Sequence, residues 1–429
     1  MKKNHVLIVG GGFGGLYAAL EFEKRCDPDF EVTLVSHDNF FLFTPLLHEV
    51  AASDLDLTHI VNPIRKMLRH VQFFEGEVLA VDIVRRQVTV THGFDQHTHA
   101  LDYDHVVFAL GCVTNFYDIP NLAETATQMK TLGDAIGLRN RLIEHLEEAA
   151  TECAARHREP LLTFVVAGGG FAGVETTGSI NGFFKEALPY YPSIRSEMIR
   201  VILVHPGEFV LPELGEELGR YAGRKLAERG VEIKTNTKIK AVTSTTVQLS
   251  DGTQIAARTL VWTAGTCPHP LLEELNLPKE RRRLRVNDTM EVEGHPNIWA
   301  LGDCAMIPDQ HGGYQPPTAQ HASREGKVLA HNIVARSRGE KLTSFRFNTL
   351  GLLASIGRRT GVARIFGVNF SGFLAWWLWR TIYLLKLPRI EKKGQSRSRL
   401  DLGSLFFERL CAISPQPLLC DSEHSKRAC

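Results

Sequence analysis

Short apolar runs that end at a glycine-rich stretch recur along this chain, and each is followed by apolar residues at helical spacing. Residues 6–9 are all apolar, glycines follow at once, and Leu16, Ala19 and Leu20 then fall at helix spacing. The same succession begins again at residues 164–166. Continuous apolar runs of this length are typical of strands buried on both faces of a parallel sheet. The pattern therefore predicts two strand–turn–helix units of an α/β fold.

Both glycine-rich turns have the spacing Gly-x-Gly-x-x-Gly, formed by Gly10, Gly12 and Gly15 in one copy and by Gly168, Gly170 and Gly173 in the other. The first glycine permits the tight bend, the second lets the backbone approach a pyrophosphate, and the third lets helix and strand pack closely. The helix N-terminus offers free N–H groups and partial positive charge to the phosphates. One copy would be a weak indication. Two copies in this context predict two dinucleotide sites, one for FAD and one for NADH or NADPH.

The residue after the second strand of each unit departs from the usual pattern. An acidic residue there normally binds the ribose hydroxyls. Here the strand at residues 31–35 is followed by Ser36, and the strand at residues 201–204 by His205. Ser36 can still hydrogen-bond a ribose hydroxyl. Because His205 does not repel a 2′-phosphate, we hypothesise that it relaxes the preference for NADH over NADPH.

Other segments alternate or end in small residues. Between residues 71 and 108 apolar positions alternate with charged ones, which predicts a β-meander. Three further strands end in turns that a bound dinucleotide could approach closely. These turns contain Ala109 with Gly111, Ala264 with Gly265, and Gly302 with Asp303.

Composition and charge exclude several classes of protein. The 429 residues, 44% of them hydrophobic, suit two or three folded domains. The formal net charge of +1 gives no overall field for nucleic acid. None of the eight cysteines forms a C-x-x-C pair, and no histidines have the H-E-x-x-H spacing. We therefore expect no metal site and mostly free, buried thiols.

Taken together, these residues resemble the pyridine-nucleotide flavoprotein reductases. Further segments are similar to one branch, the type II NADH:quinone oxidoreductases. These are FFLFTPLLHEVA at 40–51, KTLGDA at 130–135 followed by Arg139 and Asn140, GVE at 173–175 and PPTAQ at 316–320. The resemblance runs from residue 5 to about 393. It implies an FAD enzyme that oxidises NADH and reduces a membrane quinone without pumping protons, peripheral on the cytoplasmic face of the inner membrane.

The same resemblance implies a domain order and a set of site residues. The FAD-binding domain would comprise residues 1–120 and 291–345, interrupted by an NAD(P)H-binding domain at 121–290. Residues 346–429 would form a membrane-associated helical region. The implied cofactor-binding residues are Gly10, Gly12, Phe13, Gly14, Gly15, Ser36, Ala109, Gly111, Gly302 and Asp303, with Gly168, Gly170, Gly173, Glu175, His205, Ala264, Gly265, Ala319 and Gln320.

Glu175 and Gln320 are the candidate catalytic residues, because the resemblance places them at the nicotinamide or quinone. Glu175, two residues past Gly173, is expected on the first turn of its helix. Its alternative role is charge complementarity at the helix N-terminus. The alternative for Gln320 is a helix cap or surface amide.

The C-terminal region predicts attachment to a membrane surface. No run reaches the 18 apolar residues of a spanning helix, but residues 370–387 carry Trp376, Trp377, Trp379 and Tyr383. Seven basic residues follow between 380 and 399, which suits anionic lipids. The alternative is a helix that buries its tryptophans, and both can hold if the faces differ. We expect a truncation after about residue 345 to be soluble. From residue 394 the tail departs from the family, and we assign it no function.

Two rival functions remain open at this point. One is a flavoprotein reductase of another acceptor, linked to sulfide or to a ferredoxin. The other is an NADH-sensing flavoprotein similar to apoptosis-inducing factor, which would turn over slowly and act through a partner. The branch also allows a homodimer.

Overall fold

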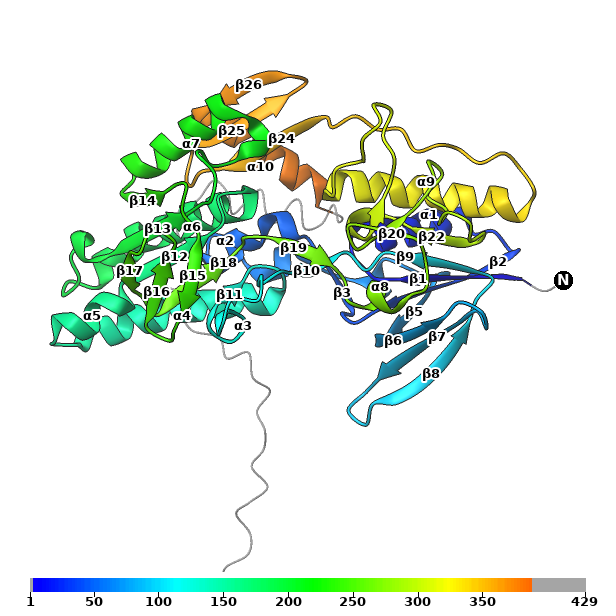
Figure 1. Ribbon diagram of the computed structural model, residues 1–429, viewed down its shortest axis with the longest axis horizontal. Helices are drawn as coiled ribbons and strands as arrows, with labels where there is room; N and C mark the ends of the chain where they lie inside the picture. Colours follow the sequence, from blue (N-terminus) through cyan, green and yellow to red (C-terminus); the bar gives the residue numbers. More distant parts are fainter. Residues whose placement is uncertain (1–2, 388–429) are drawn as a thin grey trace, which may run out of the picture. The chain divides into compact units, whose positions relative to one another are not determined.

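The computed structural model describes residues 3–387, which form two compact units (Figure 1). Of these residues, 3–43, 61–115 and 265–350 form the first unit, and 44–60, 116–264 and 351–387 form the second. Each unit is therefore assembled from three separate stretches of the chain, and each contains one of the two glycine-rich turns.

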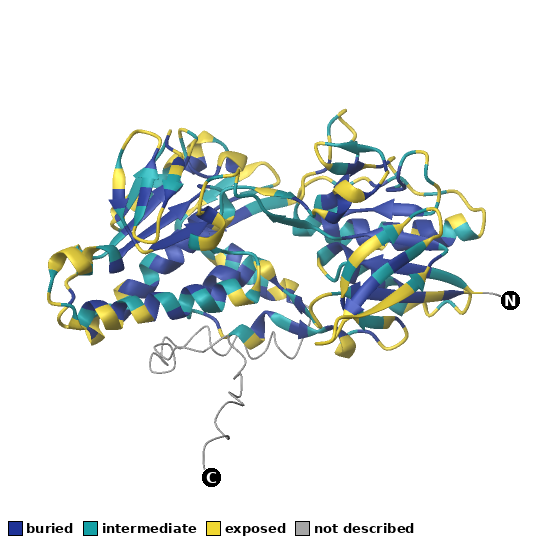
Figure 2. Cartoon of the chain, turned by 60° about the horizontal axis from the view of Figure 1, so that its bottom comes forward, coloured by how far each residue is buried: buried dark blue, intermediate teal, exposed yellow. Residues whose placement is uncertain are grey.

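A five-stranded parallel sheet forms the centre of the first unit. Its strands follow the order β22 (Ile298–Ala300), β9 (His105–Phe108), β1 (Asn4–Val9), β2 (Phe30–Ser36) and β5 (Gln72–Glu75). The apolar run at residues 6–9 is fully buried at the middle of this sheet (Figure 2). Helices α1 (Phe13–Arg25) and α9 (Ala319–Ser337) pack on each other. A Cβ at Gly326 would lie 2.4 Å from the Gly14 carbonyl oxygen, so the two helices can approach this closely only with glycine there.

Smaller sheets complete the first unit. The predicted β-meander is an antiparallel sheet of β6 (Glu77–Asp82), β7 (Gln87–His92) and β8 (His97–Asp102). The remaining elements are β3 (Phe40–Leu42) with β4 (Val61–Pro63), β10 (Cys112–Thr114) with β19 (Thr266–Pro268), α8 (Leu271–Glu274), and β20 (Lys279–Glu280), β21 (Arg283–Arg285) and β23 (Ala305–Met306).

The second unit repeats the parallel sheet. Its strand order is β11 (Thr127–Gln128), β18 (Thr259–Trp262), β12 (Thr163–Ala167), β13 (Arg200–Val204) and β14 (Val231–Lys234). Its helices are α2 (Leu47–Ala51), α3 (Leu122–Thr125), α4 (Leu132–Thr151), α5 (Ala155–Leu161), α6 (Phe171–Ala187) and α7 (Glu216–Glu228). Val165, Ile202 and Leu260 belong to one buried cluster that joins neighbouring strands.

Two antiparallel sheets and a helix complete the second unit. One sheet contains β15 (Ile239–Val242), β16 (Thr246–Leu249) and β17 (Gln254–Ala256), and the other contains β24 (Gly351–Ser355), β25 (Gly361–Ile365) and β26 (Val368–Ser371). Helix α10 (Gly372–Lys386) packs on β24 and β25. Within residues 3–387, no helix has the length and apolar character needed to span a bilayer.

The structure confirms the parallel Rossmann-like sheets and both strand–turn–helix units. The sequence left open whether the tryptophans of this segment are buried or lie at the surface. Helix α10 has both, because Trp379 is fully buried and Trp377 is half exposed. Five of the seven basic residues between positions 380 and 399, and the tail from residue 394, lie outside the described residues.

Candidate active site

The first glycine turn forms an open cradle between β1 and α1. Gly10 has a φ of 112°, and a Cβ there would lie 2.3 Å from the Ala109 carbonyl oxygen. A Cβ at Gly15 would lie 1.9 Å from the Gly10 oxygen. At Gly12, the N-cap of α1, a Cβ would meet no atom of residues 3–387 within 4 Å. The outer two glycines are therefore required by backbone packing, and the middle one leaves the backbone open to a ligand.

Other predicted residues of the first unit surround this turn. The ring of Phe13, the first residue of α1, lies 4.9 Å from that of Phe41. A Cβ at Gly14 would overlap the Leu301 side chain at 1.9 Å. Ser36 ends β2, and a Cβ at Gly11 would lie 2.6 Å from its hydroxyl oxygen.

The late Gly-Asp pair is held by two hydrogen bonds. The Gly302 N–H donates to Glu325 Oε2 at 2.8 Å, and the Cys112 thiol donates to Asp303 Oδ2 at 2.8 Å. Gly302 and Gly111 both have a φ of 67°, which favours glycine. Burial raises the pKa of Glu325 to about 8, and the Asp303 carboxylate adds to that rise. Glu325 was not predicted as a site residue.

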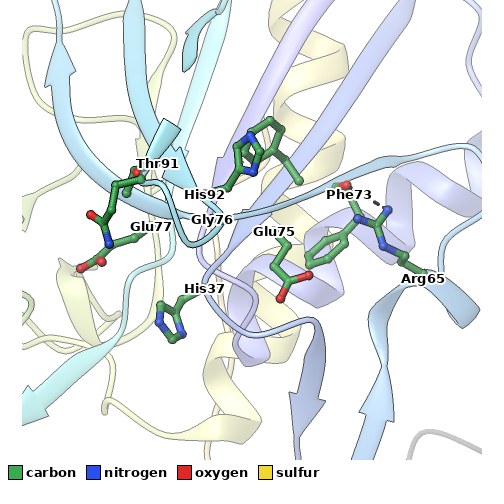
Figure 3. A pocket seen from close by; sticks show the side chains of 11 residues that line it. His37, Arg65, Phe73, Glu75, Gly76, Glu77, Thr91 and His92 are labelled. Atoms are coloured by element: carbon green, nitrogen blue, oxygen red, sulfur yellow. Dashed lines mark hydrogen bonds between the residues drawn. The ribbon is translucent and has the colours of Figure 1, made fainter. Parts of the chain in front are cut away.

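A cavity of about 570 Å³ opens beside the carboxyl ends of β2 and β5 (Figure 3). It is lined by His37 after β2, by Glu75 and Gly76 at the end of β5, and by Thr91 and His92 of the meander. Open α/β sheets bind ligands at the carboxyl ends of their strands, so this cavity has the expected position for a ligand of the first unit.

The second glycine turn repeats the geometry of the first. Gly168 has a φ of 109°, and a Cβ at Gly173 would lie 1.7 Å from the Gly168 oxygen. A Cβ at Gly168 would lie 2.9 Å from the Ala264 nitrogen, so the turn that contains Ala264 and Gly265 passes close to this glycine turn. Gly170 is the N-cap of α6, and among the described residues the only atom near its Cβ position is Glu213 Oε1, at 4.0 Å.

Glu175 lies in a buried polar cluster of the second unit. Its Oε1 accepts hydrogen bonds from the Ser355 N–H at 3.1 Å and from the Trp379 indole N–H at 3.0 Å. Its Oε2 lies 3.8 Å from His48 Nδ1. Beside it, Arg380 forms a partly buried ion pair with Glu49. The cluster therefore joins α2, α6, β24 and α10.

Burial determines the charges in this cluster. It raises the pKa of Glu175 to about 8; the Glu49 carboxylate adds to the rise, and the two N–H donors oppose it. Burial also lowers the pKa of His48 to about 3, and Arg380 lowers it further. His48 is therefore neutral at physiological pH, and its contact with Glu175 is not an ion pair. Within residues 3–387, His48 Nε2 and Glu49 Oε2 are buried without hydrogen-bond partners. Such atoms usually bind water or a ligand.

The chain matches the family model for pyridine nucleotide-disulphide oxidoreductases over residues 4–326. A type II NADH:quinone oxidoreductase of Mycobacterium tuberculosis is 33% identical over 408 residues, covering 91% of this chain and 86% of that protein. The chain belongs to this family, in its type II NADH:quinone oxidoreductase branch.

A second relative and a solved structure are also similar to this chain. A demethylphylloquinone reductase of Synechocystis is 32% identical, covering 89% of this chain and 92% of that protein. The solved structure of NDH2 from Plasmodium falciparum in complex with NADH has a TM-score of 0.88 at 20% identity, covering 93% and 98% of the two chains. At that identity the structure supports the shared fold.

One detail of the Glu175 prediction was wrong. Helix α6 begins at Phe171 and has no acidic residue in its first turn, so Glu175 lies in the second turn. Its carboxyl group also bonds β24 and α10 and not its own helix N-terminus. Gln320 is the second residue of α9 and belongs to the first unit, whereas Thr318 occupies the N-cap position.

The sequence did not show which residues surround Glu175. His48 and Glu49 lie within the segment that carried the family resemblance, and Trp379 and Arg380 lie within the apolar C-terminal segment. Nothing in their spacing joins them to residue 175. One signal was present, because Arg380 interrupts an otherwise apolar run, and a buried arginine requires an acidic partner.

Proposed function

We propose that this chain is an FAD enzyme that oxidises NADH and reduces a membrane quinone without pumping protons. Two glycine turns of equivalent geometry, one in each unit, carry the proposal, because each leaves the backbone open at its middle glycine. Relatives named as NADH:quinone oxidoreductases support the choice of donor and acceptor. When bound, FAD supplies a group that accepts a hydride and passes on electrons.

The first unit fits FAD. The open backbone at Gly12 and the N-terminus of α1 would bind the pyrophosphate. The cavity at His37 and Gly76 would take the adenosine end, and Ser36 would bind a ribose hydroxyl. Asp303, oriented by the Cys112 thiol, would bind the ribityl region. The first unit would thus contain most of the FAD-binding domain implied by the sequence.

The second unit fits the nicotinamide dinucleotide. The open backbone at Gly170 and the N-terminus of α6 would bind its pyrophosphate. Glu175, whose pKa is about 8, would be protonated at neutral pH and could give up a proton as the quinone is reduced. Gln320 would contact the nicotinamide or the quinone, as the resemblance implies.

A surface of α10 and the β25–β26 hairpin would attach the protein to a membrane from the cytoplasmic side. Phe366, Phe373, Leu374 and Trp377 are exposed on it, Phe366 to 79%. Aromatic residues of this kind favour the membrane interface. A homodimer remains a prediction from the resemblance.

Substitution tests this surface better than truncation after residue 345, because that truncation would also remove Trp379 from the core of the second unit. The double variant Phe373→Ser with Trp377→Ser should sediment less with anionic vesicles. Phe94→Ser, at an exposed phenylalanine of the first unit, is the control. Equal sedimentation of the double variant and the control would contradict membrane attachment through this surface.

An anaerobic titration tests the reaction. One equivalent of NADH should bleach the flavin absorbance of the purified protein, and a short-chain quinone should restore it quickly. Bleaching without recovery would indicate another acceptor or an NADH sensor. No bleaching would show that the assignment of the second glycine turn to NADH is wrong.

A further inference from the structure

His205, which directly follows β13, does not have a side chain that is free to bind the ribose. His205 is only 9% exposed, and its Nδ1 accepts a hydrogen bond from the Gly169 N–H at 3.1 Å. A Cβ at Gly169 would lie 2.7 Å from His205 Cγ, and one at Gly207 would lie 2.7 Å from His205 Nε2. The ring therefore fills the space between two glycines. Because Nδ1 accepts a hydrogen bond from an N–H, it carries no proton in this arrangement, so the ring offers no cation to a 2′-phosphate. Burial lowers the pKa of His205, and the Glu213 carboxylate opposes that shift.

The turn after His205 brings a carboxylate to the glycine loop instead. The Leu211 N–H donates to the Gly169 carbonyl oxygen at 2.7 Å, which anchors the turn to the loop. Leu211 is fully buried in a left-handed conformation, with a φ of 51°, which is disfavoured for a residue with a Cβ. Pro212 and Glu213 follow directly, and Glu213 Oε1 reaches 4.0 Å from the Cβ position of Gly170. Backbone strain of this kind often marks a functional position.

The charges around this carboxylate favour an unphosphorylated ribose. Glu213 is exposed and forms no ion pair within residues 3–387. Arg220 of α7 is paired with both Glu208 and Glu216, and the Arg364 guanidinium donates to the carbonyl oxygen of Leu214, the residue after Glu213. Within residues 3–387 the turn therefore presents a carboxylate without an ion-pair partner, and the guanidinium that contacts the turn binds the Leu214 carbonyl oxygen. A ribose with two hydroxyls suits a carboxylate acceptor, whereas a 2′-phosphate would be repelled.

We propose that the Glu213 carboxylate, and not His205, binds the adenosine ribose hydroxyls of the nicotinamide dinucleotide and excludes a 2′-phosphate. The enzyme then prefers NADH to NADPH, in contrast to the relaxed preference that the sequence suggests for His205. This inference rests on the proposed function, since it assigns a residue of the same dinucleotide site.

Binding of two fragments tests the proposal without hydride transfer. ADP-ribose and its 2′-phosphate are titrated calorimetrically into the full-length, flavin-containing protein and into Glu213→Gln. The wild type should bind ADP-ribose at least about tenfold more tightly than the phosphorylated fragment. In the variant this ratio should fall about tenfold, because a hydrogen bond to a charged group and a charge repulsion are both removed. Glu217→Gln is the matched control, since its carboxylate bonds Asn369 at 2.8 Å and carries the same charge nearby.

Each result of the fragment titrations either supports the proposal or contradicts it. A ratio that falls in Glu213→Gln but not in Glu217→Gln supports the proposal. Equal wild-type binding of both fragments overturns it, as does the same ratio in both variants. If Glu213→Gln binds both fragments more tightly by the same factor, the carboxylate only repels the pyrophosphate, and the proposal fails. NADH turnover measured on the same preparations separates failure of this proposal from failure of the proposed function. Normal NADH turnover with unchanged selectivity in Glu213→Gln refutes only the role of Glu213. A wild type that binds neither fragment would refute the dinucleotide site itself.

Discussion

Replacing Glu175 by glutamine should make the stability of the protein less sensitive to pH. Glu175 is only 8% exposed, and burial raises the pKa of its carboxyl group from 4.5 to about 8. A rise of that size disfavours the ionised form by up to about 5 kcal/mol relative to an exposed carboxyl, at about 1.4 kcal/mol for each pH unit. At pH 7 the group is then about nine-tenths protonated.

The sign follows from proton binding. Between about pH 4.5 and 8 the folded protein keeps a proton at Glu175 that the unfolded chain has released. Stability from this group is therefore highest at low pH and falls as the pH rises through that window, and it is constant above it. Glutamine stays neutral and can still accept the hydrogen bonds of Ser355 and Trp379. The stability of Glu175→Gln relative to the wild type should therefore increase by several kcal/mol from pH 5 to pH 9.

Thermal unfolding of the full-length, flavin-containing protein, followed by flavin fluorescence across this pH range, measures the difference. The other titrating groups are the same in both proteins, so their contributions to the pH dependence cancel in the difference. Glu217→Gln makes the same chemical change at an exposed position and separates burial from loss of charge. Parallel curves for the wild type and Glu175→Gln would show that Glu175 is ionised throughout, and the argument from burial would be wrong.

Three further predictions concern the two dinucleotide sites and turnover. Substitution of Glu175 or Gln320 should lower turnover without releasing FAD, and normal kcat in both variants would remove them from the mechanism. Trp379→Phe removes a donor that favours the ionised carboxylate, so the pKa of Glu175 should rise further and the pH profile of kcat should shift to higher pH; an unchanged profile would contradict this. Gly15→Ala places a methyl group against backbone in the first unit and should abolish flavin retention, whereas Gly173→Ala should keep the flavin and lose NADH binding. Absorbance at the flavin band and NADH titration distinguish the last two, and loss of flavin in both would argue against separate sites.

The sequence predicted the parts of the fold that depend on neighbouring residues. The strand before Gly10 and the strand before Gly168 were found because a buried strand and a glycine turn are both local patterns. The meander at β6–β8 followed from alternation in the same way. These elements position most of the candidate dinucleotide-binding residues.

The surroundings of Glu175 could not be predicted in this way. His48, Ser355 and Trp379 meet residue 175 from up to 204 positions away, and no periodicity encodes such contacts. Glu213 was missed for another reason. The fingerprint expects its acidic residue directly after a strand, whereas here the carboxylate comes from an irregular turn that depends on the left-handed Leu211.

Helix α10 has two faces with different surroundings, and the helix connects a buried carboxyl group with an exposed apolar surface. One face buries Trp379, which donates its hydrogen bond to Glu175, and the other exposes Phe373 and Trp377. If the exposed face inserts into lipid, any displacement of the helix alters the donor that stabilises the Glu175 carboxylate. By thermodynamic linkage, the protonation of Glu175 must then alter lipid affinity to the same degree. The protein would sense its own membrane attachment, because the proton affinity of Glu175 would differ between the free and the attached protein.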